Sequence, residues 1–84
     1  HMKLIPIDHV YVVNSNNLEE RAGLYVDAET GVVYFFNGNG VGPCPRYDSN
    51  GRIMVVPKEQ IPQVTMRFAR AEAAEADRRR TRQV

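Results

Sequence analysis

The 84-residue sequence has no tryptophan, a single cysteine and one histidine besides the N-terminal His1. Cys44 has no second cysteine with which to form an internal disulfide, and it stands between two prolines. With His9 as the only other soft ligand, no Cys/His cluster has metal-ligand spacing. The sequence therefore predicts no metal site and no cofactor. Cys44 is interpreted as a half-buried loop residue, because activating its thiol would need a neighbouring base or cation.

Long apolar runs are also missing. The longest, 32–36 and 53–56, are far shorter than the roughly 20 residues of a membrane-spanning helix. The N-terminal residues lack the pattern of a signal peptide, and the His1-Met2 start is interpreted as a cloning remnant with Met2 as the native start. We therefore expect a single cytoplasmic domain over 1–84 that has no membrane partner.

Groups that could carry catalysis are sparse. Asp8 and His9 are the only acid and imidazole that adjoin, and neighbouring side chains on a strand point to opposite faces. Gly38, Gly40 and Gly42 form a glycine run after a strand, but a phosphate loop needs a helix N-terminus directly after it, and here prolines follow. No carboxylate pair or catalytic triad is found. The sequence predicts a protein that is not an enzyme.

Charge is unevenly distributed, although the net charge is only +1. Residues 1–66 hold five Lys or Arg against seven Asp or Glu, whereas residues 67–84 hold six Arg against three acids. The basic character is therefore confined to the C-terminal segment. Such arginines could contact nucleic-acid phosphates, while the acids among them favour a solvated helix end. The candidate nucleic-acid residues are Arg67, Arg70, Arg78, Arg79, Arg80 and Arg82.

Short β-branched and aromatic runs separated by turn formers predict an antiparallel β-meander of four to five strands over 9–56, after a lead-in over 1–8. Strands are expected over 9–13, 23–26, 32–36, 46–47 and 52–56. In the turn between the second and third strands, Asp27 and Thr30 side chains should bond turn amides, with Gly31 in the left-handed conformation. A second hairpin, with Asn-Gly at its tip, is expected around 48–51.

The third predicted strand is apolar on both faces. Val33 and Phe35 alternate with Val32, Tyr34 and Phe36, whereas an antiparallel strand with one wet face should alternate apolar with polar. Either the strand is central, with the helix on one face and a curled sheet or a partner on the other, or one face is exposed. Val33, Tyr34 and Phe35 are therefore interaction candidates.

Beyond a turn over 57–61, the hydrophobic period changes to that of an amphipathic helix over 62–84. The stripe expected to lie on the sheet consists of Ile61, Val64, Phe68 and Ala71. A helix from Pro62 to about Arg80 would be about 28 Å long and should outrun strands of about 17–20 Å. Its overhanging part would present Ala69, Ala73 and Ala76 to another helix or sheet. The predicted fold is α+β, a meander followed by one long C-terminal helix.

The stretch Val26-Asp27-Ala28-Glu29-Thr30-Gly31-Val32-Val33-Tyr34 and the turn Asp48-Ser49-Asn50-Gly51 carry a resemblance. Over residues 22–56, the chain resembles a family of short phage and bacterial proteins of unknown function with a V-D-x-x-T-G-V-x-Y hairpin and a D-x-x-G turn. The resemblance implies a phage or mobile-element context and adds no catalytic residue. The Arg-rich helix is not part of the family's pattern.

Two functions from different classes follow. The first is a small protein-binding module that self-associates, most simply as a two-fold dimer, and acts on an unidentified host protein. Its size, its two-faced apolar strand and its overhanging helix favour this function. The second is a protein that binds nucleic acid or nucleotides through the arginines of the C-terminal segment. A curled sheet that covers itself would instead leave a monomer with a frayed basic tail.

Overall fold

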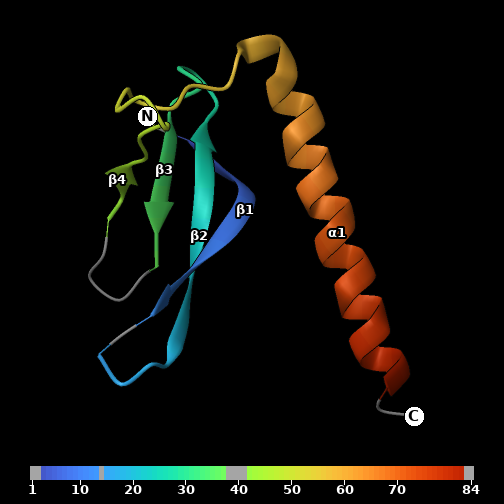
Figure 1. Ribbon diagram of the computed structural model, residues 1–84. Coiled ribbons are helices and arrows are strands. Elements are labelled where there is room, and N and C mark those ends of the chain that lie inside the picture. Colours follow the sequence, from blue (N-terminus) through green and yellow to red (C-terminus); the bar gives the residue numbers. More distant parts are fainter. Residues whose placement is uncertain (1–2, 14, 38–41, 83–84) are drawn as a thin grey trace.

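The computed structural model of the protein describes residues 3–13, 15–37 and 42–82. Four antiparallel strands form one sheet in the order β1-β2-β3-β4, and one long helix follows (Figure 1). The elements are β1 Leu4–Val13, β2 Glu19–Asp27, β3 Val33–Phe36, β4 Cys44–Pro45, the 3₁₀ turn η1 Lys58–Gln60 and α1 Ile61–Arg82. The predicted α+β meander with one C-terminal helix is confirmed.

The first strand is twice as long as expected. β1 begins at Leu4, so the prediction that residues 4–8 are only a lead-in was wrong. Proline is tolerated at Pro6 because β1 is an edge strand, where a missing N–H breaks no ladder hydrogen bond. The register then shifts between Pro6, which pairs with Tyr25, and Asp8, which pairs with Leu24. This bulge bends β1 and sets the direction of its second half.

The hairpin between β2 and β3 is closed as its residues predict. The Asp27 carboxylate accepts hydrogen bonds from the Glu29 amide at 2.9 Å and from the Thr30 hydroxyl at 3.0 Å. Gly31 has φ +79°, and a Cβ there would lie 2.2 Å from the Val56 carbonyl oxygen. The left-handed glycine is therefore required both by its backbone angles and by the close approach of another segment.

The second turn forms as expected, but its flanking strands are shorter. Asp48 Oδ1 accepts hydrogen bonds from the amides of Asn50 and Arg52, at 2.8 and 3.0 Å. The residues around this turn make isolated bridges, Tyr47 with Ile53 and Val32 with Val55. The last predicted strand, over 52–56, is thus reduced to single bridging residues.

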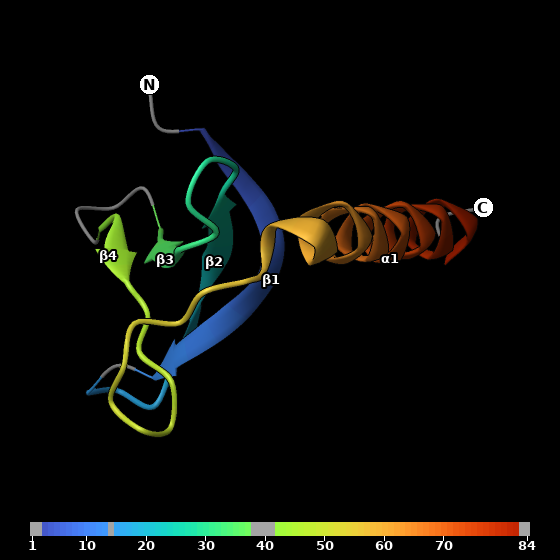
Figure 2. The same ribbon diagram turned by 90° about the horizontal axis from the view of Figure 1, so that it is seen from above.

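One face of the sheet forms the core. Val26 and Val33, which are partners across β2 and β3, are both 0% exposed. Ala22, Leu24 and Ile61 complete the buried apolar residues. Seen along the strands, the chain after β4 crosses one face of the sheet from the β4 side to the β1 side before it enters α1 (Figure 2). The sheet is therefore partly covered by its own C-terminal connection.

The helix lies beside β1, at the opposite end of the sheet from β4 (Figure 2). The residues that are buried or half-buried on α1 recur at helical spacing, and they are Ile61, Val64, Thr65, Phe68, Glu72 and Glu75. The expected stripe therefore holds up to Phe68, whereas Ala71 is exposed and Glu72 takes the inward position. The reason is Arg21 on β2: the Glu72 carboxylate can pair with this cation, whereas the Ala71 methyl group cannot.

The overhang was expected because the strands were taken to be five or six residues long, and this premise does not hold for β1. β1 has 10 residues and α1 has 22, so each spans about 33 Å. β1 and α1 instead differ in the direction in which they run. The C-terminal half of α1 leads away from the sheet while the second half of β1, still paired with β2, curves away from α1 (Figure 1). A wedge therefore opens between β1 and α1.

Candidate protein-interaction site

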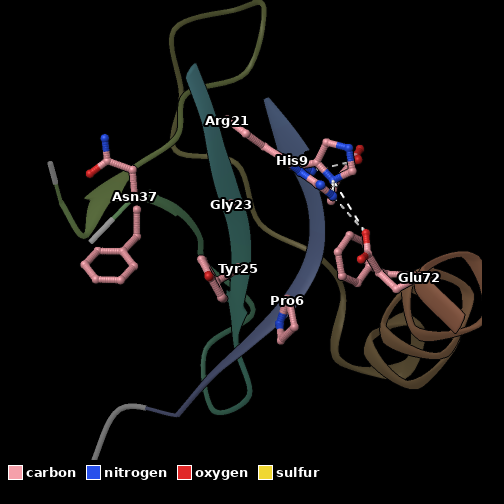
Figure 3. Close-up of a pocket in the computed structure, with 10 residues that line it drawn as sticks. Pro6, His9, Arg21, Gly23, Tyr25, Asn37 and Glu72 are labelled. Atoms are coloured by element: carbon pink, nitrogen blue, oxygen red, sulfur yellow. Dashed lines mark hydrogen bonds and ion pairs between the residues drawn. The ribbon is translucent and has the colours of Figure 1, made fainter. Parts of the chain in front are cut away.

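A groove of about 400 Å³ lies where the outer face of the sheet meets α1 (Figure 3). The sheet's register puts alternate residues of β1, β2 and β3 on this face, and the first turns of α1 close one side. Its walls are formed by Pro6, Asp8, His9, Arg21, Gly23, Tyr25, Phe36, Asn37, Phe68 and Glu72.

Aromatic rings form much of this groove. Gly23 has no side chain, and the Tyr25 ring leans over it, so that a Cβ at Gly23 would lie 2.7 Å from Tyr25 Cε2. The Phe36 ring meets Tyr25 edge-on, with ring centres 6.2 Å apart. A ring that covers a strand glycine in this way restores the packing that the glycine lacks. The groove thus presents a half-buried aromatic surface.

A polar cluster joins the helix to the sheet. Arg21 Nη2 donates to Glu72 Oε1 at 3.0 Å and lies 2.9 Å from His9 Nδ1. Because a guanidinium has only donors, His9 Nδ1 is the acceptor in this hydrogen bond. The rings of Tyr11 and Phe68 meet the His9 ring edge-on, at 5.7 and 6.1 Å.

Sequence reasoning missed this cluster. It considered His9 only beside Asp8 and expected their side chains not to cooperate; in the structure Asp8 Oδ1 accepts the backbone N–H of His9 at 2.8 Å and does not contact the imidazole. The detectable signal was Glu72, an acid one turn after Phe68 on the inward stripe of a helix. A carboxylate at such a position requires a cation nearby.

The predicted interaction residues on β3 are divided between the two faces. Val33 has no exposed surface, so this side chain cannot contact a partner, and Phe35 is half-buried on the same face. The burial arises because the chain after β4 folds back, with the Val33 amide donating to the Met54 carbonyl at 3.0 Å. Tyr34 is half-buried on the outer face, opposite Tyr25.

The predicted alanine face of the helix is open. Ala69, Ala73 and Ala76 are all exposed, and Met66, which continues the same side of the helix, is 53% exposed. Residues at these spacings lie along one side of an α-helix. The structure thus leaves this side of α1 uncovered along the part that leads away from the sheet.

The arginines divide into two groups. Arg78 and Arg79 pair with Glu75, and Arg80 pairs with Asp77, all within one helical turn. Arg67 and Arg70 border a shallow hollow together with Gln63 and Met66. The side chain of Arg82 lies outside the described part of the chain. Glu75 and Asp77 therefore offset two of the positive charges at this end of the chain.

The remaining chemical candidates are not brought together. Cys44 lies on β4, at the opposite edge of the sheet from β1 and its histidine. Of the glycine run at 38–42, residues 38–41 lie outside the described residues. Within residues 3–13, 15–37 and 42–82, no group of three or more His, Cys, Asp or Glu is placed to hold a metal ion. In the same part of the chain, no helix is long and apolar enough to cross a membrane.

A model of a family of unknown function, DUF6440, matches residues 9–56, more than half of the chain. The chain belongs to the DUF6440 family. The predicted resemblance to a small family of unknown function is confirmed, with a match that begins earlier than residue 22. The DUF6440 match includes His9 and Arg21 but ends before α1, which supplies Glu72. No curated protein and no solved structure matches the chain.

Proposed function

We propose that this DUF6440 protein is a non-enzymatic protein-binding module that self-associates as a two-fold dimer. The observation that carries the proposal is that the chain exposes more surface than a compact monomer of its mass. A compact 9.5 kDa monomer exposes about 5,000 Å², whereas this chain exposes 6566 Å². The radius of gyration of 14.6 Å likewise exceeds the roughly 12 Å of a compact domain of this length. Both excesses support a protomer that buries part of this surface against a partner.

The excess is large enough for an interface. It amounts to about 1,500 Å² over the compact value, and a standard interface needs about 800 Å² from each partner. Much of it lies on α1, where every described side chain after Phe68 is exposed except Glu72 and Glu75. A helical segment with so little packing is only marginally stable in water. Contact with a partner would supply the missing burial.

The charge pattern of α1 favours a second copy of the chain as the partner. Arg70 and Asp77 flank the same side of the alanine face, seven residues apart. In an antiparallel helix pair centred near Ala73, Arg70 of each copy stands opposite Asp77 of the other, and small side chains let the two helices approach closely. The Arg80–Asp77 pair within each helix is exposed, so sharing Asp77 sacrifices little stability.

The dimer is tested by light scattering over micromolar to millimolar concentrations. We expect a mass of twice the 9.5 kDa chain, and we expect Ala73→Glu to shift the protein toward the monomer because it places a like charge on each side of the axis. Ala74→Glu is the matched control, since Ala74 is also exposed but lies about 100° round the helix. A wild-type mass of one chain at every concentration would refute self-association.

Nucleic-acid binding is the second candidate, favoured by Arg67 and Arg70. Both are exposed, and among the described residues no acid forms an ion pair with either. Affinity for duplex DNA that falls steeply with salt and is lost in Arg67→Gln/Arg70→Gln would favour this function over a dimer. The proposal also places the protein in the cytoplasm and in a phage or mobile-element context, where it would act on a host protein.

A further inference from the structure

The second half of β1 is an unusually open sheet edge. β1 ends the strand order, and over the described residues no strand pairs with its outer side. Tyr11, Val12 and Val13 are 58%, 47% and 58% exposed. An uncovered edge of this kind presents unpaired N–H and C=O groups to any other chain.

The register shows which backbone groups point outward. Just after β2, the Ala28 amide donates to the Lys3 carbonyl, so alternate residues before it on β2 (Val26, Leu24 and Ala22) direct their backbone groups toward β1. Their partners after the bulge are Asp8 and Val10, and the series continues with Val12. The N–H and C=O groups of His9, Tyr11 and Val13 therefore point away from the sheet.

The two halves of this edge differ in protection. In the first half, Pro6 carries no N–H, the bulge breaks the register, and the Asp8 carboxylate accepts the outward N–H of His9 at 2.8 Å. These are devices that keep edge strands from pairing. The second half has none of them: residues 10–13 contain no proline, no charge and no register shift.

The space beside this edge is open as well. A groove of about 370 Å³ separates Tyr11 from α1, and its helical wall includes Phe68, Ala71, Glu72 and Glu75. It coincides with the wedge where α1 and β1 diverge (Figure 1). Because α1 and the edge of β1 lie at the same end of the sheet (Figure 2), one interface can include both.

We infer that the outer edge of β1 at residues 11–13 joins the same edge of a second copy, so that two four-stranded sheets become one. This inference rests on the proposed dimer and adds a strand contact about the same two-fold axis as the helix pair. The segment is self-complementary: antiparallel pairing about Val12 sets Tyr11 opposite Val13 of the partner, an aromatic against a β-branched side chain, and opposes no like charges. Tyr11 and Val13 then exchange backbone hydrogen bonds, while the His9 N–H stays with Asp8.

The first test removes the outward donor. Tyr11→Pro takes away the N–H that faces the partner and leaves the ladder to β2 intact, because the N–H groups of Val10 and Val12 face β2. We expect the dimer Kd to rise about tenfold or more, while Tyr11→Val, which keeps the N–H, stays dimeric. Circular dichroism checks the fold. If Tyr11→Pro unfolds, Val13→Pro replaces it, since its N–H also points outward.

The second test reads the register directly. In a Cys44→Ser background, Val12→Cys should form an intermolecular disulfide on mild oxidation, because Val12 faces its own copy across the axis within disulfide range. Val10→Cys is the matched control on the same face of the strand, and it should stay reduced because its copy lies several residues away. A Tyr11→Pro protein that remains a dimer, or equal cross-linking at both positions, would overturn the edge pairing and leave the dimer itself standing. A monomeric wild type would end both.

Discussion

At the scale of single residues, two glycines show how local conformation and tertiary contact differ. Gly31 and Gly51 have nearly the same backbone, with φ of +79° and +77°. Nothing lies within 4 Å of a Cβ built on Gly51, whereas a Cβ on Gly31 would meet the Val56 carbonyl oxygen. A glycine closes the turn at both sites, but replacing it should cost more folding stability at Gly31 than at Gly51.

The pair gives a direct prediction for stability. Gly51→Ala should cost about 1 kcal/mol, the strain of a left-handed alanine. Gly31→Ala should cost about 3 kcal/mol or more, because it adds a clash with backbone and disturbs the hydrogen bond from the Val56 amide to the Gly31 carbonyl. Urea unfolding of both variants measures the difference. Equal losses would show that the segment over 53–56 does not lie against this turn.

At the scale of elements, α1 is joined to the sheet by few side chains. Phe68 contacts His9 ring to ring, and Glu72 pairs with Arg21. Phe68, which the sequence places on the stripe facing the sheet, is half-buried, so it should contribute less stability than a fully buried ring. The remainder of the helix depends on its own backbone hydrogen bonds or on a partner.

Phe68→Ala should therefore destabilise the protein by about 2 kcal/mol, roughly half the loss for a fully buried phenylalanine. Gln63→Ala is the control on the same helix, and since Gln63 is exposed, it should cost less than about 0.5 kcal/mol. Thermal or urea unfolding provides the comparison. If the two variants lose the same stability, α1 is not held to the sheet through Phe68.

At the scale of the whole molecule, the extended shape and the proposed dimer are linked. The molecule measures 44 × 36 × 26 Å along its principal axes, and α1 accounts for much of the longest dimension. Dimerisation through α1 and the edge of β1 would bury surface in both elements at once. Protein concentration should then control the stability of α1 without altering the sheet core.

Amide hydrogen exchange tests this link. We expect amides at 70–80 to exchange more slowly as concentration rises through the dimer Kd, because burial suppresses local opening of the helix. The amides of Leu24 and Val26, inside the β1–β2 ladder, serve as controls and should not respond. Rapid exchange after Ala74 at every concentration would mark a monomer with a loose C-terminal arm.

Local chemistry accounts for the parts of this protein that the sequence predicts well. The turn at 27–31 needs only an Asp, a Thr and a Gly within a few residues, and α1 needs only a change of hydrophobic period near Pro57. Both are short-range, so both can be recognised in one stretch of sequence. The position of Phe68 on the inward stripe follows from the same periodicity.

The rest depends on segments far apart in the chain. β1 starts at Leu4 because Pro6 lies at a sheet edge, which is a property of the assembled strand order. Val33 is buried because a distant connection folds over it, and the polar cluster forms because β1, β2 and α1 bring His9, Arg21 and Glu72 together. The hydrophobic period of a segment shows which of its residues share a face, but it does not show which distant segments lie against that face. Only the packing of the whole chain brings such groups within hydrogen-bonding range and leaves the edge of β1 open.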